Sequence, residues 1–107
     1  MEFPEVAPAA LTGAAATYYT VPANRKLIRI KIILSNTSNA PVNCLIYAVP
    51  SAGSPAIANN IFADNLDGLE PVEADYTLNL AAGGTIQGLA SIAAIVGMRI
   101  APALQIV

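Results

Sequence analysis

The sequence predicts an all-β fold of the antiparallel β-sandwich type. Short runs rich in β-branched and aromatic residues follow one another along most of the 107 residues, with turn-forming residues about every 8 to 12 positions. Apolar and polar residues alternate within these runs, as in strands with one buried face. The eight prolines stand at the edges of the runs, where a sheet tolerates them.

The first three predicted strands are the most regular. Residues 17–21 form a short strand that ends before Pro22 and Asn24. The next, 26–35, has an apolar face and a basic face, formed by Ile28, Ile30, Ile32 and Leu34 against Arg29 and Lys31. A turn at 36–39 leads to a third strand, 42–49. Both faces of that strand are mostly apolar, which predicts a central position or an interface.

The second half contains shorter strands and one long predicted loop. A short strand is expected within 56–63, after the turn-rich segment 50–55. Residues 64–75 hold five of the seven acidic residues together with Gly68 and Pro71, which predicts an exposed loop. Three more strands are expected at 76–80, 85–90 and 95–101. The glycine pair after the first of them predicts a hairpin turn, and Pro102 ends the last. A turn of helix is allowed between the last two strands.

Residues 1–16 lack this alternation and predict an extended N-terminal arm preceding a β-sandwich domain at 17–107. In a monomer such an arm would fray. In an assembly it would lie across a neighbour, with Phe3, Val6 and Leu11 as anchors.

The composition predicts that other protein surfaces cover this chain. Apolar residues make up 55% of the sequence and charged residues only 11%, compared with about 25% charged in average soluble proteins. No apolar run reaches the roughly 18 residues of a membrane span, and Glu2 and Glu5 stand where an export signal has basic residues. We therefore expect a homo-oligomer, a dimer or trimer, and no membrane partner.

The same composition argues against several other functions. A net charge of −2 disfavours nucleic-acid binding. The single cysteine, Cys44, excludes an internal disulfide, favours a reducing compartment, and is expected as a small buried residue on a strand. No histidine is present, so the usual triads and zinc sites cannot be built. We expect no enzyme activity, no cofactor and no metal, while calcium in the acidic segment 64–75 stays an alternative.

The charges are strongly segregated along the sequence. Four of the five basic residues lie between Arg25 and Lys31, while the acidic residues gather in 64–75. We expect the basic strand face of one subunit to meet the acidic segment of a neighbour, which would orient assembly. The residues proposed for this contact are Arg25, Arg29, Lys31, Asp64, Asp67 and Glu70. The simpler interpretation is two solvated surfaces.

Two segments carry a resemblance to a known group of proteins. Residues 19–38 (YTVPANRKLIRIKIILSNTS), the following PVNCLIYAVPSAG, and 76–90 (YTLNLAAGGTIQGLA) resemble a pattern in small bacteriophage virion proteins. The resemblance spans about two-thirds of the chain and implies a jelly-roll β-sandwich used as a building block, without catalytic residues.

The resemblance implies a capsid decoration, or cement, protein. Such a protein binds the major capsid protein, oligomerises on the particle surface, and is made in the host cytoplasm. A small tail-associated or host-surface-binding module is the alternative, disfavoured by the scarcity of aromatic residues.

Overall fold

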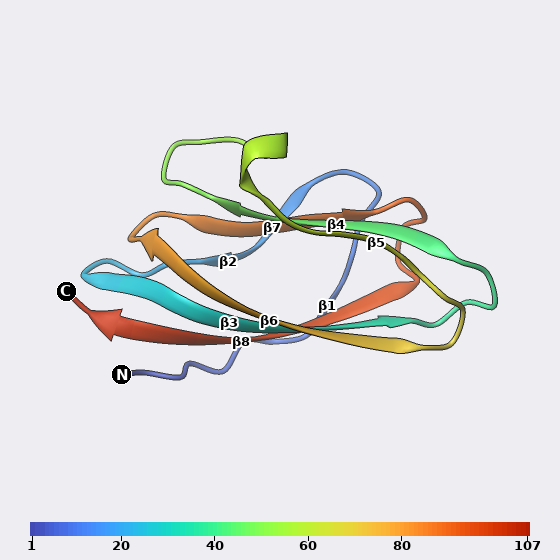
Figure 1. Cartoon of the computed structure of the whole chain (residues 1–107), viewed down its shortest axis with the longest axis horizontal. Helices are drawn as coiled ribbons and strands as arrows, with labels where there is room; N and C mark the ends of the chain where they lie inside the picture. Colours follow the sequence, from blue (N-terminus) through green and yellow to red (C-terminus); the bar gives the residue numbers. More distant parts are fainter.

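A computed structural model describes residues 1–107 as two stacked four-stranded antiparallel sheets (Figure 1). The strand order in sheet A is β1 (Ala9–Ala10), β8 (Val96–Ile106), β3 (Arg25–Asn36) and β6 (Pro71–Ala81). The order in sheet B is β2 (Ala16–Thr20), β7 (Thr85–Ala90), β4 (Val42–Val49) and β5 (Asn60–Leu66). A 3-10 turn, η1 (Ile57–Asn59), precedes β5. The predicted all-β sandwich is confirmed, with β4 and β7 at their predicted bounds.

The strand order follows one rule. The first strand pairs with the last, the second with the last but one, and so on inward to β4 and β5, which are joined by the segment 50–59. The chain is thus one long antiparallel hairpin rolled up so that β8 also pairs with β3 and β7 with β4. Eight strands in this arrangement form a jelly roll, as the resemblance implied.

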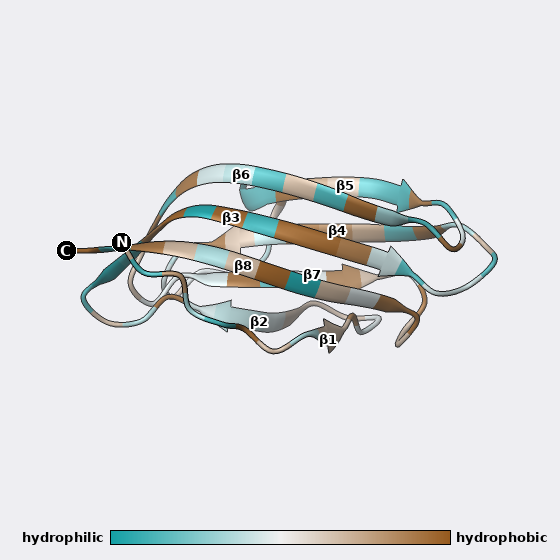
Figure 2. Ribbon diagram, turned by 90° about the horizontal axis from the view of Figure 1, so that it is seen from below, coloured by the Kyte–Doolittle hydropathy of each residue, from teal (hydrophilic) through white to brown (hydrophobic).

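The core lies between the sheets and is built by alternate residues of every long strand. Figure 2 shows the resulting alternating bands along β3 and β6. The largest fully buried side chains come from both sheets and include Leu27, Ile30, Ile32, Leu34, Ile46, Leu66 and Ile86. Cys44 is also fully buried, as predicted. A β-bulge between Leu27 and Arg29 turns Leu27 inward and leaves Ile28 half-buried, which corrects the predicted face.

The predicted loop 64–75 is wrong. Strand β5 continues to Leu66 and β6 begins at Pro71, so only 67–70 forms the connection. In β6, exposed Glu73 and Asp75 alternate with half-buried Val72 and Ala74. This alternation is typical of a strand with one solvent-exposed face. The high density of acidic residues suggested a loop instead.

Two other predicted boundaries also change. Strand β8 runs through Pro102 to Ile106. Leu104 exchanges backbone hydrogen bonds of 2.8 Å with Glu2 on the side of β8 away from β3. Pro102 lies two residues earlier and faces that same open side, so its missing N–H costs no ladder bond. The predicted glycine hairpin turn is wrong, because β6 and β7 belong to different sheets. The chain passes from one sheet to the other through Gly83, whose φ of 85° suits glycine.

The N-terminal segment packs against its own chain. Ala9 and Ala10 pair with β8, and Leu11 is fully buried in the core. Val6 is half-buried against that core, whereas Phe3 is 73% exposed. The extended arm is therefore not seen, and Leu11 is inaccessible to a neighbour. No helix in the structure has the length and apolar character to cross a membrane.

Candidate interaction surfaces

The outer face of sheet A carries most of the charge of the molecule. All five lysines and arginines lie on β3 and β8. The alternation that buries Ile30 and Ile32 turns Arg29 and Lys31 outward, and Arg99 is exposed on the neighbouring strand. Glu73 and Asp75 stand on the same face, on β6. This face is a mixed-charge surface.

The basic and acidic residues of this face pair with each other within one chain. Arg29 donates to both carboxylate oxygens of Asp75 through Nε at 3.2 Å and Nη2 at 3.4 Å. Lys31 Nζ lies 2.7 Å from Glu73 Oε1, and this hydrogen bond raises the pKa of the lysine. The sequence placed these charges in separate segments, and the β3–β6 register brings them together.

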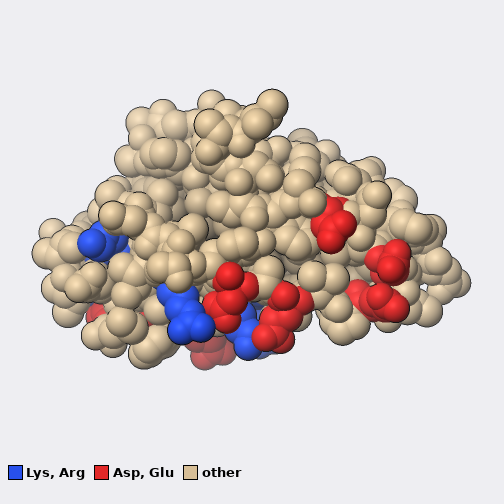
Figure 3. All heavy atoms as spheres, in the orientation of Figure 1, with Lys and Arg blue, Asp and Glu red and all other residues tan.

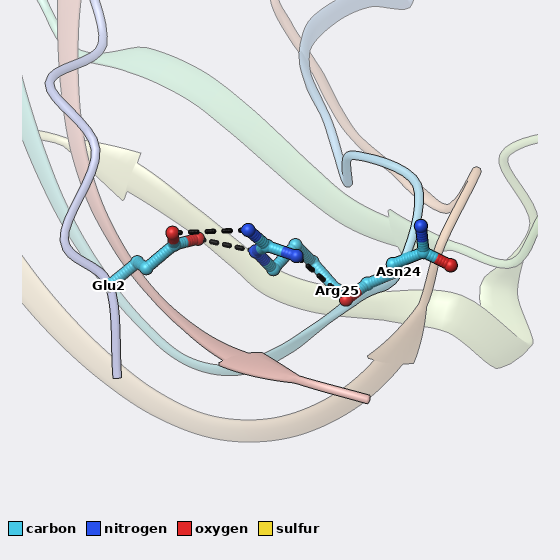
Figure 4. Close-up of polar contacts among 3 residues, drawn as sticks. All are labelled: Glu2, Asn24 and Arg25. Atoms are coloured by element: carbon cyan, nitrogen blue, oxygen red, sulfur yellow. Dashed lines mark hydrogen bonds and ion pairs between the residues drawn. The ribbon is translucent and has the colours of Figure 1, made fainter.

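A third ion pair ties the N-terminal segment to the sandwich (Figure 4). Arg25 donates to the Glu2 carboxylate through Nε at 2.5 Å and Nη2 at 3.2 Å, and its Nη1 donates to the Asn24 carbonyl at 3.1 Å. The hydrogen bond from Arg25 lowers the pKa of Glu2 and the same bond raises the pKa of Arg25. Arg25 therefore binds its own chain and is already partnered.

The other predicted contact residues are scattered. Asp64 is exposed on the edge strand β5, where its carboxylate accepts from the Asn65 backbone N–H at 2.8 Å, and Asp67 and Glu70 lie in the connection to β6. No three His, Cys, Asp or Glu side chains are grouped so as to hold a metal ion.

Two shallow grooves mark the outer face of sheet A. The larger, about 530 Å³, runs between the N-terminal segment and β3, with Ile33 and Arg99 in its lining. The smaller, about 220 Å³, lies between Phe3 and the Arg29–Asp75 pair. Both are open to the surface.

The outer face of sheet B differs in having no charged side chain. Asp64 is the only charged residue on its four strands, and it lies on the inward side of the edge strand β5, opposite buried Cys44. The centre of the face is formed by two outward pairs from the middle strands, Leu45 beside Leu89 and Tyr47 beside Gln87, all half-buried. In Figure 3 charged side chains lie over the sheet A half and the right-hand end, whereas the top, over β4, β7 and the 50–59 segment, has none.

A projection rises beside this uncharged face. In Figure 1 the segment 50–59, with η1, stands above sheet B on the side away from sheet A. Its Ile57 is 96% exposed, the highest value among the large apolar residues. Sequence reasoning flagged the apolar outer side of 42–49 but missed Ile57. The available signal was the uncharged stretch from Ile32 to Ala63.

The polar groups inside the sandwich form no reactive arrangement. Burial raises the pKa values of the Cys44 thiol and of the Tyr19 and Tyr76 hydroxyls, which keeps all three protonated near neutral pH. Asn36 is the one buried polar side chain and bonds the backbone at Ala40 and Leu66. Its role is to join the two sheets at one end of the sandwich.

Comparison with solved structures finds the same architecture in a plant-virus protein. The structure of the Tobacco streak virus coat protein dimer matches over 95% of this chain and 83% of that chain, with a TM-score of 0.50 and 11% sequence identity. The likeness is one of fold. A second structure of that coat protein, in a C2 crystal form, gives a TM-score of 0.47 at 13% identity, covering 94% of this chain and 79% of that chain. No family model and no curated protein matches the sequence.

Proposed function

We propose that this chain is a viral structural protein, a decoration or cement protein that binds the major capsid protein of a bacteriophage and oligomerises on the capsid surface. The observation that carries the proposal is the jelly roll, which a viral coat protein shares along 95% of the chain. The sequence resemblance to small bacteriophage virion proteins supports the same class. Fold alone does not fix function, so the chemistry of the surface must agree.

The surface chemistry agrees with a protein that acts by binding. The proposed role needs two contact surfaces, one for the capsid shell and one for sister subunits. The charged outer face of sheet A and the uncharged outer face of sheet B offer two such surfaces of different character. In this proposal the chain works without a catalytic site, cofactor or metal.

The proposal is tested by sedimentation with viral shells. Purified protein is mixed with capsids of its virus assembled without it and, separately, with host cells, and each is pelleted. We expect saturable binding to the capsids and none to the cells. Binding to the cells alone would instead support the tail-associated or host-surface-binding module, and binding to neither would remove both functions.

A further inference from the structure

We propose that two copies of this chain join through the outer face of sheet B around a two-fold axis, with Ile57 of each copy packed against the face of the other. The inference rests on the proposed role as an assembling subunit and adds the surface through which it assembles. It commits to a second copy of the same chain as the partner, for three independent reasons.

The first reason is charge. A two-fold contact places the same surface of both copies face to face, so a charge near the axis meets its own like charge. The outer face of sheet A carries Arg29, Lys31 and Arg99 and would suffer this repulsion in part. The outer face of sheet B carries no charged side chain, because Asp64 lies opposite buried Cys44 on the inward side of the edge strand β5. A second copy can therefore cover the outer face of sheet B without bringing like charges together.

The second reason is hydrogen bonding. The polar side chains of this face are amides and hydroxyls, which both donate and accept, so each is able to pair with its own symmetry mate. Gln87 bonds Thr85 Oγ1 at 2.9 Å, and Asn43 bonds Asn65 Oδ1 at 3.2 Å. A carboxylate or an ammonium group lacks this self-complementarity.

The third reason is size. The molecule measures 44 Å along its longest axis, which the strands follow, and 19 Å along its shortest, which crosses the strands of each sheet (Figures 1 and 2). Sheet B covers part of this length: with about 3.4 Å per residue and about 4.8 Å between strands, eight-residue β4 and its three neighbours form a face of roughly 500 Å². Together with the 50–59 projection, this face approaches the roughly 800 Å² that each partner contributes to a standard protein interface. Leu45 and Leu89 at its centre provide an apolar middle surrounded by uncharged polar groups, as in typical interfaces.

Ile57 is held firmly enough to act as an anchor. Asn59 Oδ1 accepts from the Ala56 N–H at 2.9 Å, and Asn59 Nδ2 donates to the Ser54 carbonyl at 3.2 Å. The next residue, Asn60, donates to the Ile46 carbonyl of β4 at 3.1 Å. An apolar side chain on a turn fixed in this way loses little freedom on binding, which favours affinity.

The test compares two exposed apolar residues that receive the same charge. Sedimentation equilibrium of the full chain is expected to give a dimer, and Ile57→Glu is expected to weaken it by at least about tenfold. Leu69→Glu, at a 66% exposed leucine in the β5–β6 connection, adds the same charge away from the face and should leave dimerisation unchanged. Circular dichroism verifies that both variants fold. A monomeric wild type, a trimer, or equal effects of the two variants would overturn the interface.

A charge exchange tests the two-fold geometry directly. Gln87→Glu and Gln87→Lys should each weaken the homodimer, and an equal mixture of the two should associate more tightly than either alone, because unlike charges then face each other. A mixture no tighter than the separate variants would contradict a two-fold contact centred on β7.

Capsid sedimentation separates this interface from the proposed function. Wild type that dimerises through this face but ignores the shells would keep the interface and remove the decoration role. Wild type that binds shells as a monomer would keep the decoration role and remove the interface. Loss of shell binding in Ile57→Glu with self-association intact would assign the face to the shell and overturn the inference.

Discussion

The two sheets share one core but present opposite outer faces. Sheet A places ion pairs between β3 and β6 on its outer face, whereas sheet B shows leucine, tyrosine and uncharged amides from β4 and β7. The inner faces of both sheets are apolar and form the core, so the difference between the outer faces is not needed for a stable fold. In the proposed assembly this asymmetry has a use: sheet A faces solvent or a polar partner, and sheet B faces the second copy.

The largest expected effect tests whether the inner faces are equivalent. Ile32→Ala in sheet A and Ile46→Ala in sheet B each remove a fully buried side chain from the same core. Both should lower the free energy of unfolding by about 2–5 kcal/mol, measured by chemical denaturation at a protein concentration where the oligomeric state is fixed. If only one of them is destabilising, the core is not shared equally between the sheets.

The next effect concerns the residue that joins the sheets. Asn36 Nδ2 donates to the carbonyls of Ala40 and Leu66 at 2.8 and 3.1 Å, and its Oδ1 accepts from the Ser38 N–H at 3.0 Å. Asn36→Ala leaves these buried groups without partners and should cost about 1–3 kcal/mol in the same assay. Asn79→Ala, at an exposed asparagine of β6 outside the proposed interface, is the control and should change little.

A smaller change of opposite sign is expected at the edge of sheet B. The Tyr19 hydroxyl is buried and has no hydrogen-bond partner. Tyr19→Phe removes this group without altering the packed ring, so stability should rise by up to about 1 kcal/mol. Tyr18→Phe removes a hydroxyl that accepts from the Thr12 N–H at 3.1 Å and should not stabilise. A destabilised Tyr19→Phe would mean that the hydroxyl bonds a group outside the isolated chain.

The ion pairs of sheet A should contribute little to folding. The Arg29 and Asp75 side chains are 65% and 46% exposed, so a double-mutant cycle with Arg29→Gln and Asp75→Asn should give a coupling below about 1 kcal/mol that falls with added salt. Dimerisation should be unaffected by either change. A dimer lost in both single variants would move the self-contact to sheet A.

The smallest effect is the pH dependence of the N-terminal ion pair. Arg25 lowers the pKa of Glu2 below 4.5, so its contribution is complete above the pKa of the unfolded chain and is lost as pH falls through the lower folded value. Carboxyl carbon NMR should report that lower pKa in the folded protein, and Arg25→Gln should return it toward 4.5. An unchanged Glu2 titration in that variant would contradict the pair.

Local patterns predicted the strands well, and tertiary pairing explains what they missed. The alternation at 85–90 and the doubly apolar run at 42–49 matched β7 and β4 in full. The prediction for 64–75 failed because Glu73 and Asp75 suggested a loop. These two residues form the solvent-exposed face of β6 and pair with side chains of β3. Which outward residues share a face depends on the sheet assignment of each strand. The sequence therefore revealed the charges but not their partners, and the apolar stretches but not the uncharged face they form.

The rolled hairpin also determines when folding can begin. Every strand ladder joins a strand from β1 to β4 with one from β5 to β8, so the N-terminal half has no partner of its own. On the ribosome, the first ladder becomes possible only after β5 emerges opposite β4, and the β1–β8 pair closes last. Such long-range pairing belongs to topologies that fold in milliseconds to seconds. During synthesis the apolar strands up to Val49 must wait unpaired, which makes translation the stage at which this chain is most exposed to aggregation.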